Sequence, residues 1–197
     1  MSNFFEVKNV DFSVGGKIKV KDVSFSIKNE GDIICLLGPS GIGKTTIIDL
    51  ISGLLKPSHG KIKIDGKSLE DIQAIRSWQN NIGYIPQQTV LYNATILENI
   101  TYGRNYEKND EENLNKAIKY SELNDFIKEK QGGLNYEISE RGSNLSGGQM
   151  QRFAIARGLY TDPDILICDE FTSSLDNPTQ EKILNSLNKL VGKVTII

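Results

Sequence analysis

A glycine-rich stretch in the first quarter of the chain has the residue types of a phosphate-binding loop. Residues 38–45 read Gly-Pro-Ser-Gly-Ile-Gly-Lys-Thr, which fits the pattern G-x-x-x-x-G-K-[ST]. Glycines let successive backbone N–H groups turn toward one anion, and the start of the following helix adds its positive dipole end. Lys44 would reach the β- and γ-phosphates, and the Thr45 hydroxyl would bind Mg²⁺. The residues expected to contact a nucleotide here are Gly38, Pro39, Ser40, Gly41, Ile42, Gly43, Lys44, Thr45 and Thr46.

Two consecutive acids follow a second apolar run near the end of the chain. Residues 165–168 are apolar, and Asp169 and Glu170 come next. Successive strand residues point to opposite sides, so the two acids can have different roles. Asp169 would hold Mg²⁺ through water, and Glu170 would polarise the attacking water as a general base. Alone, such a pair is equally typical of a solvated turn, but together the two motifs indicate a triphosphate site.

The elements that must position these residues alternate between strands and helices. Apolar and polar residues alternate over 5–27, with Gly15-Gly16 as a hairpin turn, and again over 61–64, with Asp65-Gly66 as the next turn. The segment 32–37 is continuously apolar after Asp32, which predicts a strand buried on both faces. Helical spacing is seen over 45–51, 110–130 and 148–159, and a second buried strand is expected over 164–168. This order predicts an α/β fold with a parallel sheet.

Composition excludes several classes of protein. Of the 197 residues, 23 are Lys or Arg and 25 are Asp or Glu, so no basic excess is present to hold nucleic acid. The longest apolar run, 33–37, is far shorter than the ~20 residues that cross a bilayer, and no signal peptide is evident. We therefore expect a soluble, cytosolic chain. Cys35 and Cys168 lie in apolar runs and are expected to be buried thiols rather than a disulfide.

Between the two motifs, residues 145–149 read Leu-Ser-Gly-Gly-Gln. With this pentapeptide, Gln87 and the segment 174–176 (Ser-Leu-Asp) in the same order, the chain resembles the ATP-binding cassette (ABC) family from about Phe5 to its end. The resemblance implies one nucleotide-binding domain over 1–197, which uses ATP and Mg²⁺. It implies the P-loop NTPase fold, in which a RecA-like core carries an antiparallel β subdomain and an inserted α-helical subdomain at about 88–150.

The pentapeptide has physical features of its own. Ser146, Gly147, Gly148 and Gln149 open a helix, so their N–H groups and the serine hydroxyl make a second anion site. Without context, Ser-Gly-Gly is more typical of a flexible loop. The resemblance implies that this site meets the γ-phosphate of an ATP held by a second nucleotide-binding domain, so that ATP binding produces a dimer.

The resemblance assigns roles to two more residues. It implies that Gln87 contributes to the metal site and catalysis and links them to the coupling helices of a transmembrane domain. It places Asp176 in a loop that crosses the dimer interface. Without the resemblance, Gln87 reads as a surface residue and Asp176 as a helix cap.

Two segments resemble the exporter branch of the family, and two positions depart from its pattern. The segments are 91–100 and 136–142, with Glu137 at the acidic position of the second; a charged surface turn is the alternative. The family's adenine-stacking aromatic falls at Val14, and Phe12 could replace it only if the register were shifted. The family continues past Ile197 into a histidine, and His59 is expected at the surface instead. We therefore expect a C-terminally truncated domain that is weakly active or inactive alone and mainly monomeric.

These observations favour the ATPase motor of an ABC exporter on the cytoplasmic face of a membrane. Its expected partners are a second nucleotide-binding domain and a transmembrane domain, with no nucleic acid. Two alternatives remain open. One is a soluble ABC ATPase acting on ribosomes or DNA, and the other is a nucleotide-binding module without turnover.

Overall fold

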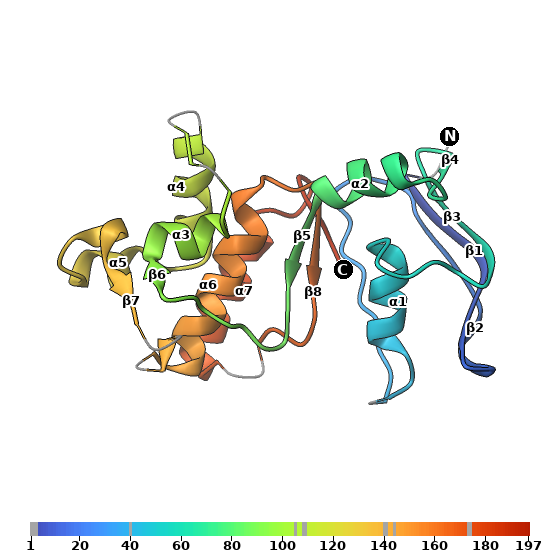
Figure 1. Cartoon of the computed structure of the whole chain (residues 1–197), viewed down its shortest axis with the longest axis horizontal. Coiled ribbons are helices and arrows are strands. Elements are labelled where there is room, and N and C mark those ends of the chain that lie inside the picture. The colour runs from blue at the N-terminus through green and yellow to red at the C-terminus, as the bar shows by residue number, and fades with distance from the viewer. Residues whose placement is uncertain are drawn as a thin grey trace.

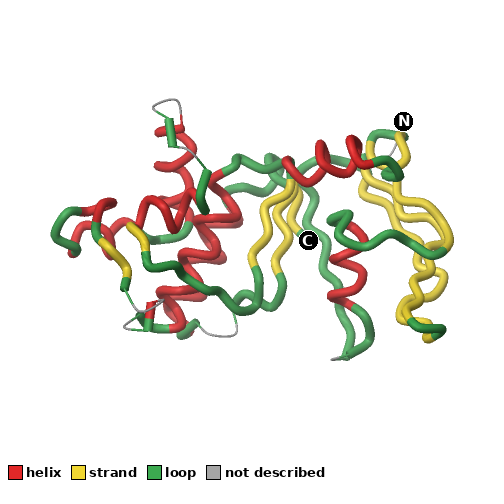
Figure 2. Tube along the Cα trace, viewed as in Figure 1, coloured by secondary structure: helices red, strands yellow, loops and turns green. Residues whose placement is uncertain are grey.

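Two lobes flank a short parallel sheet in the computed structural model of the chain (Figure 1). The structure describes residues 4–39, 41–104, 106–107, 110–139, 142–143, 145–172 and 175–197. One lobe is rich in antiparallel strands and the other in helices, as the colours of Figure 2 show. The predicted α/β class is confirmed.

The strand-rich lobe is built on an antiparallel sheet of order β2-β1-β3-β4. Its strands are β1 (Phe5–Val14), β2 (Lys17–Ile27), β3 (His59–Ile64) and β4 (Lys67–Ser68). The two predicted turns are confirmed, since Gly15 and Gly16 have φ of 56° and 74° and Asp65 and Gly66 have φ of 48° and 77°. Positive φ at both central residues gives the turn a twist that matches its flanking strands. This lobe also carries α1 (Lys44–Ile51) and α2 (Ile72–Asn80).

The central sheet is parallel and has the order β5-β8-β9. These strands are β5 (Ile82–Ile85), β8 (Ile165–Cys168) and β9 (Thr195–Ile196). Strand β8 is buried on both faces because its side chains alternate: Ile165 and Ile167 join the core of the strand-rich lobe, and Leu166 joins the helical core. Strand β8 therefore contributes side chains to both hydrophobic cores.

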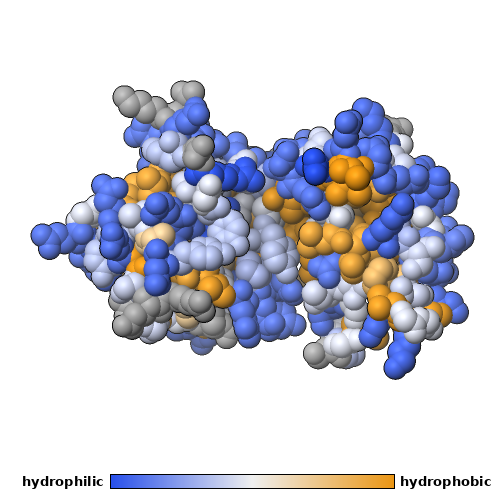
Figure 3. All heavy atoms as spheres, viewed as in Figure 1, coloured by the Kyte–Doolittle hydropathy of each residue, from blue (hydrophilic) through white to orange (hydrophobic). Residues whose placement is uncertain are grey.

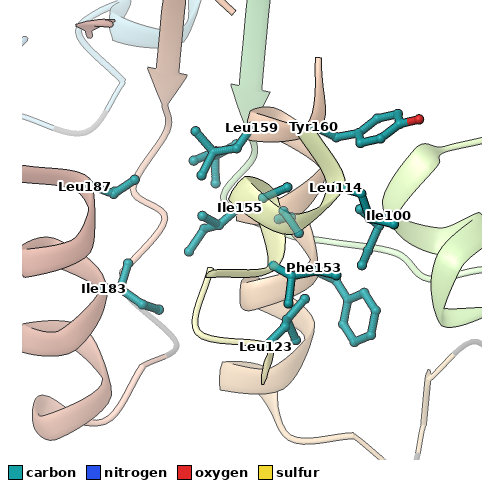
Figure 4. Packing of buried hydrophobic residues seen from close by; sticks show 14 of the residues in the cluster. Ile100, Leu114, Leu123, Phe153, Ile155, Leu159, Tyr160, Ile183 and Leu187 are labelled. Carbon is teal, nitrogen blue, oxygen red and sulfur yellow. The ribbon is translucent and has the colours of Figure 1, made fainter. Parts of the chain in front are cut away.

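The helical lobe packs around α6 (Gly147–Tyr160). Its other elements are α3 (Ile96–Thr101), α4 (Glu111–Tyr120), α5 (Asn124–Glu129), α7 (Asn177–Asn188), the 3₁₀ turn Gly133–Asn135 and the hairpin of β6 (Ala94–Thr95) and β7 (Glu137–Ile138). Figure 4 shows Phe153 and Ile155 of α6 among Leu114 of α4 and Ile183 of α7. The predicted helical subdomain, 88–150, contains α3 to α5, and its boundaries stay a prediction.

The segment 32–37 corrects the sequence-based expectation of a strand buried on both faces. It forms one parallel bridge, between Ile33 and Ile196, made by the hydrogen bonds from the Ile34 N–H to the Ile196 carbonyl and from the Ile196 N–H to the Asp32 carbonyl. Side chains still alternate, so Ile34 and Leu36 pack on the strand-rich core while Ile33 is 55% and Leu37 87% exposed. A ladder partner covers only the start of the segment in the described part of the chain.

The same segment explains why the prediction for the first cysteine was wrong. Cys35 lies on the outward face and is exposed, whereas Cys168 at the end of β8 is largely buried. Burial raises the pKa of the Cys168 thiol to about 12. Both thiols are free, as expected. No helix that the structure describes is long and apolar enough to span a bilayer.

Candidate functional site

Three elements end or begin at one edge of the molecule. Strands β5 and β8 point toward the same edge, and α1 begins there (Figure 1). A hollow separates the two lobes in the space-filling view (Figure 3). A cavity of about 470 Å³ is lined at this edge by Phe12, Val14, Lys19, Gly41, Gly43, Lys44, Thr45, Thr46, Gln87, Asp169 and Glu170. The structure thus brings the two sequence motifs, 125 residues apart at Lys44 and Asp169, to one place.

The phosphate loop adopts a conformation that depends on its glycines. Gly41 and Gly43 have φ of 80° and 106°, a region that side chains disfavour. Gly43 is the N-cap of α1, and its carbonyl accepts a hydrogen bond from Ile47. The ammonium of Lys44 donates to the carbonyls of Gly38 and Pro39, at 2.8 and 3.2 Å. These two bonds tie Lys44 to the start of the loop, while Ser40 lies outside the described residues.

On the other side of the cavity, Gln87 and Glu170 are hydrogen-bonded to each other. The Gln87 amide donates to a carboxylate oxygen of Glu170 at 2.9 Å. Glu170 has φ of 45°, a left-handed conformation that few non-glycine residues adopt. Its neighbour Asp169 continues the parallel ladder through its N–H to the Ile85 carbonyl, at 3.0 Å. Strain at this position is a feature of functional sites, where the surroundings over-determine one geometry.

Asp169 has two titratable neighbours that sequence reasoning missed. The Tyr84 hydroxyl, from β5, lies 3.4 Å from a carboxylate oxygen of Asp169. Burial and the charge of Asp169 raise the pKa of Tyr84 to about 12. Burial and the same charge raise the pKa of Asp49 in α1 above its ordinary value. The alternation of β5 could have indicated Tyr84, but only the packing of α1 brings Asp49 near.

The cavity end formed by β1 and β2 corrects the expectation that Val14 alone occupies the adenine-stacking position. Val14 lines the cavity as predicted, yet Phe12 lines it too. The register of β1 against β2 shifts on both sides of Phe12, between Val10 and Phe12 and between Phe12 and Ser13. Phe12 and Val14 are two residues apart in β1, so ordinary strand alternation places both side chains on the face that lines the cavity. Lys19 of β2 completes this end of the cavity and was not expected from the sequence.

The pentapeptide residues lie apart from this cavity. Ser146 is the N-cap of α6, and its hydroxyl accepts the N–H of Gln149 at 3.1 Å while the Gln149 side chain accepts the Ser146 N–H at 2.9 Å. This capping box leaves the N–H groups of Gly147 and Gly148 at the exposed start of the helix. Neither these four residues nor Asp176 lines the cavity.

Three further predicted positions have plain structural surroundings. Asp176 is the N-cap of α7, and hydrogen bonds from Thr179 lower its pKa. Glu137 is exposed in β7, where it pairs with Thr95. His59 is exposed at the start of β3, as expected.

The donor set of the cavity fits a hard divalent cation. Thr45, Gln87 and Asp169 supply a hydroxyl, an amide and a carboxylate, and all three line the same space. Mg²⁺ prefers oxygen ligands and binds one or two carboxylates together with substrate phosphates. No cluster of three His, Cys, Asp or Glu side chains occurs within the described ranges, and Mg²⁺ needs none.

Known proteins match this chain over most of its length. An ATP-dependent lipid A-core flippase of Cupriavidus pinatubonensis is 40% identical over 169 residues, which are 85% of this chain and 28% of that protein. The beta-(1-->2)glucan export ATP-binding/permease protein NdvA of Agrobacterium vitis is 38% identical over 186 residues, 94% of this chain and 31% of that protein. The chain spans about a third of the length of these relatives.

A solved structure agrees with the sequence relatives. A bacterial Atm1-family ABC exporter with ATP bound superposes with a TM-score of 0.85 at 35% identity, covering 98% of this chain and 34% of that one. The model of the family described as "ABC transporter" matches residues 20–173, which include the phosphate loop, the pentapeptide and the two acids. On this sequence match and this fold, the chain belongs to the ABC transporter family.

Proposed function

We propose that this chain binds Mg·ATP in the 470 Å³ cavity and hydrolyses it as the motor of an exporter. The single observation that carries the proposal is the convergence of Lys44, Thr45, Gln87, Asp169 and Glu170 on one cavity. The relatives are named as a flippase and a glucan exporter, which supports export as the work that hydrolysis drives. The transported molecule would cross a membrane from its cytoplasmic face.

Each polar side chain has a role that follows from its position. Lys44 exchanges its bonds to the loop carbonyls for bonds to the β- and γ-phosphates. Thr45, Asp169 and Gln87 would hold Mg²⁺, which neutralises charge on the phosphate oxygens when bound. Glu170 accepts the proton of the attacking water, and the Gln87 amide orients its carboxylate.

The second anion site suggests a partner. A cavity on one lobe and an exposed helix start at Ser146, which does not line that cavity, allow a head-to-tail pair of domains. In such a pair, Ser146, Gly147, Gly148 and Gln149 of each domain contact the γ-phosphate bound to the other. Asp176 lies at the interface, and Gln87 and Glu137 face the coupling helices of a transmembrane domain.

The first test removes the lysine of the phosphate loop. Lys44→Ala is expected to abolish saturable binding of a fluorescent ATP analogue, because the remaining loop lacks its cation for the β- and γ-phosphates. Lys17→Ala, an exposed lysine of β2 outside the cavity, is the matched control and should bind normally. Equal affinity in the Lys44→Ala and unchanged chains would reject the assignment.

The second test separates binding from turnover. Glu170→Gln removes the general base but keeps the shape of the side chain, so ATP binding should remain while phosphate release falls by ~10²–10⁴-fold. Steady-state phosphate release by the variant is compared with that of the unchanged chain. Undiminished release would show that Glu170 is not the base.

A further inference from the structure

Lys19 lies where the strand-rich lobe meets the phosphate loop. Its carbonyl oxygen is 3.2 Å from where a Cβ on Gly43 would stand, so its backbone packs directly on the last glycine of the loop. Its side chain lines the cavity together with Phe12 and Val14 of the neighbouring strand. Lys19 therefore lies against the start of α1 and lines the same cavity as the apolar Phe12 and Val14.

The ammonium of Lys19 is available to a ligand. The side chain is exposed, and within the described part of the chain it makes no ion pair or hydrogen bond. A lysine ammonium is a compact point charge on a flexible four-carbon stem and binds phosphate readily. Lys44, by contrast, already has two carbonyl partners within the loop.

We propose that Lys19 binds the α-phosphate of the nucleotide as a second cation from the side of β2. This inference rests on the proposed function, because it takes ATP as the ligand of the cavity. With the base against Phe12 and Val14 and the β- and γ-phosphates on Lys44, the α-phosphate falls between them, beside Lys19. The charge contact supplements the weak hold that the aliphatic Val14 has on a base.

The test compares the affinities of ATP and ADP in three variants. Lys19→Ala should weaken both nucleotides about tenfold and to the same extent, because both carry an α-phosphate. Lys19→Arg should restore most of the affinity. Lys21→Ala, an exposed lysine of the same strand that does not line the cavity, should change affinity less than twofold. The loss in Lys19→Ala should shrink as salt is raised.

Several results would overturn the proposal. An equal loss in Lys21→Ala would indicate only general attraction, and a loss confined to ATP would place the lysine at the γ-phosphate. A Lys19→Ala chain that melts at a lower temperature without nucleotide would indicate a structural role. If the unchanged chain binds no ATP, or Lys44→Ala binds it normally, the proposed function fails as well. If Lys44→Ala loses binding and Lys19→Ala keeps it, only the role of Lys19 fails.

Discussion

At the scale of single residues, two carboxylates of like charge lie near each other: Asp169 after β8 and Asp49 in α1. Asp49 lies in the last turn of this helix, where the dipole end disfavours an anion, and it faces the like charge of Asp169. Burial first and this repulsion second raise the pKa of Asp49 in the folded chain. Because the pKa of this carboxyl is higher in the folded chain than in the unfolded chain, its protonated form favours folding. This contribution to stability is fully present below the unfolded pKa and is lost as the pH rises through the folded pKa.

Asp49→Asn should therefore stabilise the chain at neutral pH. Because the side chain is only partly buried, solvent screening keeps the gain small, and we expect the melting temperature to rise by about 1–2 °C at pH 7. The gain should vanish at about pH 3, where the carboxyl of the unchanged chain is protonated. Asp125→Asn is the control, since Asp125 lies in the first turn of α5, where the dipole favours an anion. A lower melting temperature at pH 7 would contradict this account.

At the scale of elements, β5 lies unusually close to α6. A Cβ on Gly83 would collide with the backbone carbonyl of Gly158, and a Cβ on Gly158 would come within 3.1 Å of Ile85. Backbone atoms cannot yield as a flexible side chain does. Two glycines therefore set the distance between the strand that leads to Gln87 and the helix that begins at Ser146.

Gly83→Ala should destabilise the chain by about 1–3 kcal/mol, the usual cost of overpacking. Urea unfolding measures the change. Gly148→Ala is the matched control, because its Cβ would meet only Leu175 and Ser146 at ordinary distances of 3.6 and 3.9 Å. Alanine is also preferred to glycine within a helix. Equal stability of the two variants would show that the strand and helix can move apart at little cost.

A half-buried arginine, Arg157, ties α3 to α6. The Arg157 guanidinium donates to the carbonyls of Asn99 and Val90 at 2.6 and 2.7 Å and to the Asn99 side chain at 2.9 Å. The rings of Tyr92 and Tyr102 lie within 5.8 Å of its central carbon. Burial lowers the pKa of Arg157 without removing its charge at neutral pH.

Arg157→Lys should cost about 1–3 kcal/mol in urea unfolding, although the charge is kept. A single ammonium cannot span three acceptors, so at least one of the oxygens of buried Asn99 or exposed Val90 loses its partner. Arg76→Lys on the exposed face of α2 should be neutral. A neutral result at Arg157 as well would mean that charge alone, and not the planar fork, holds the two helices.

At the scale of the whole molecule, the proposed pairing of two domains depends on the start of α6. Ser146→Asp keeps an N-cap of equal quality, so the helix and the melting temperature should be preserved. Its charge would repel the γ-phosphate of the partner's ATP. With ATP, Glu170→Gln should raise the dimer fraction in light scattering above that of the mainly monomeric unchanged chain, and adding Ser146→Asp should remove this increase while ATP still binds. Ser146→Asn, a neutral cap, is the control and should lose less of the dimer.

A dimer that forms equally in the Ser146→Asp variant would contradict the proposed interface. Loss of ATP binding together with the dimer would instead place Ser146 in the monomer's own site.

Features that depend on neighbouring residues were predicted well from the sequence. The glycine turns, the start of α1 at Lys44 and the helix start at Ser146 are decided by φ preferences and by hydrogen bonds over three or four residues. The burial of β8 was also readable, because a strand that separates two cores must be apolar on both faces. The chemistry of the phosphate loop is contained in eight consecutive residues.

Other features were decided only when distant segments packed together. The bond from Gln87 to Glu170 joins residues 83 apart, and the contact of Tyr84 with Asp169 joins residues 85 apart. The same apolar pattern that buries β8 leaves 32–37 half open, since its ladder partner β9 reaches only the start of that segment. Packing of the first hairpin on the start of α1 brought Phe12 and Lys19 to the cavity. Local propensity determines which residues can form a strand or a loop, but exposure and side-chain partners depend on which other backbone lies beside it.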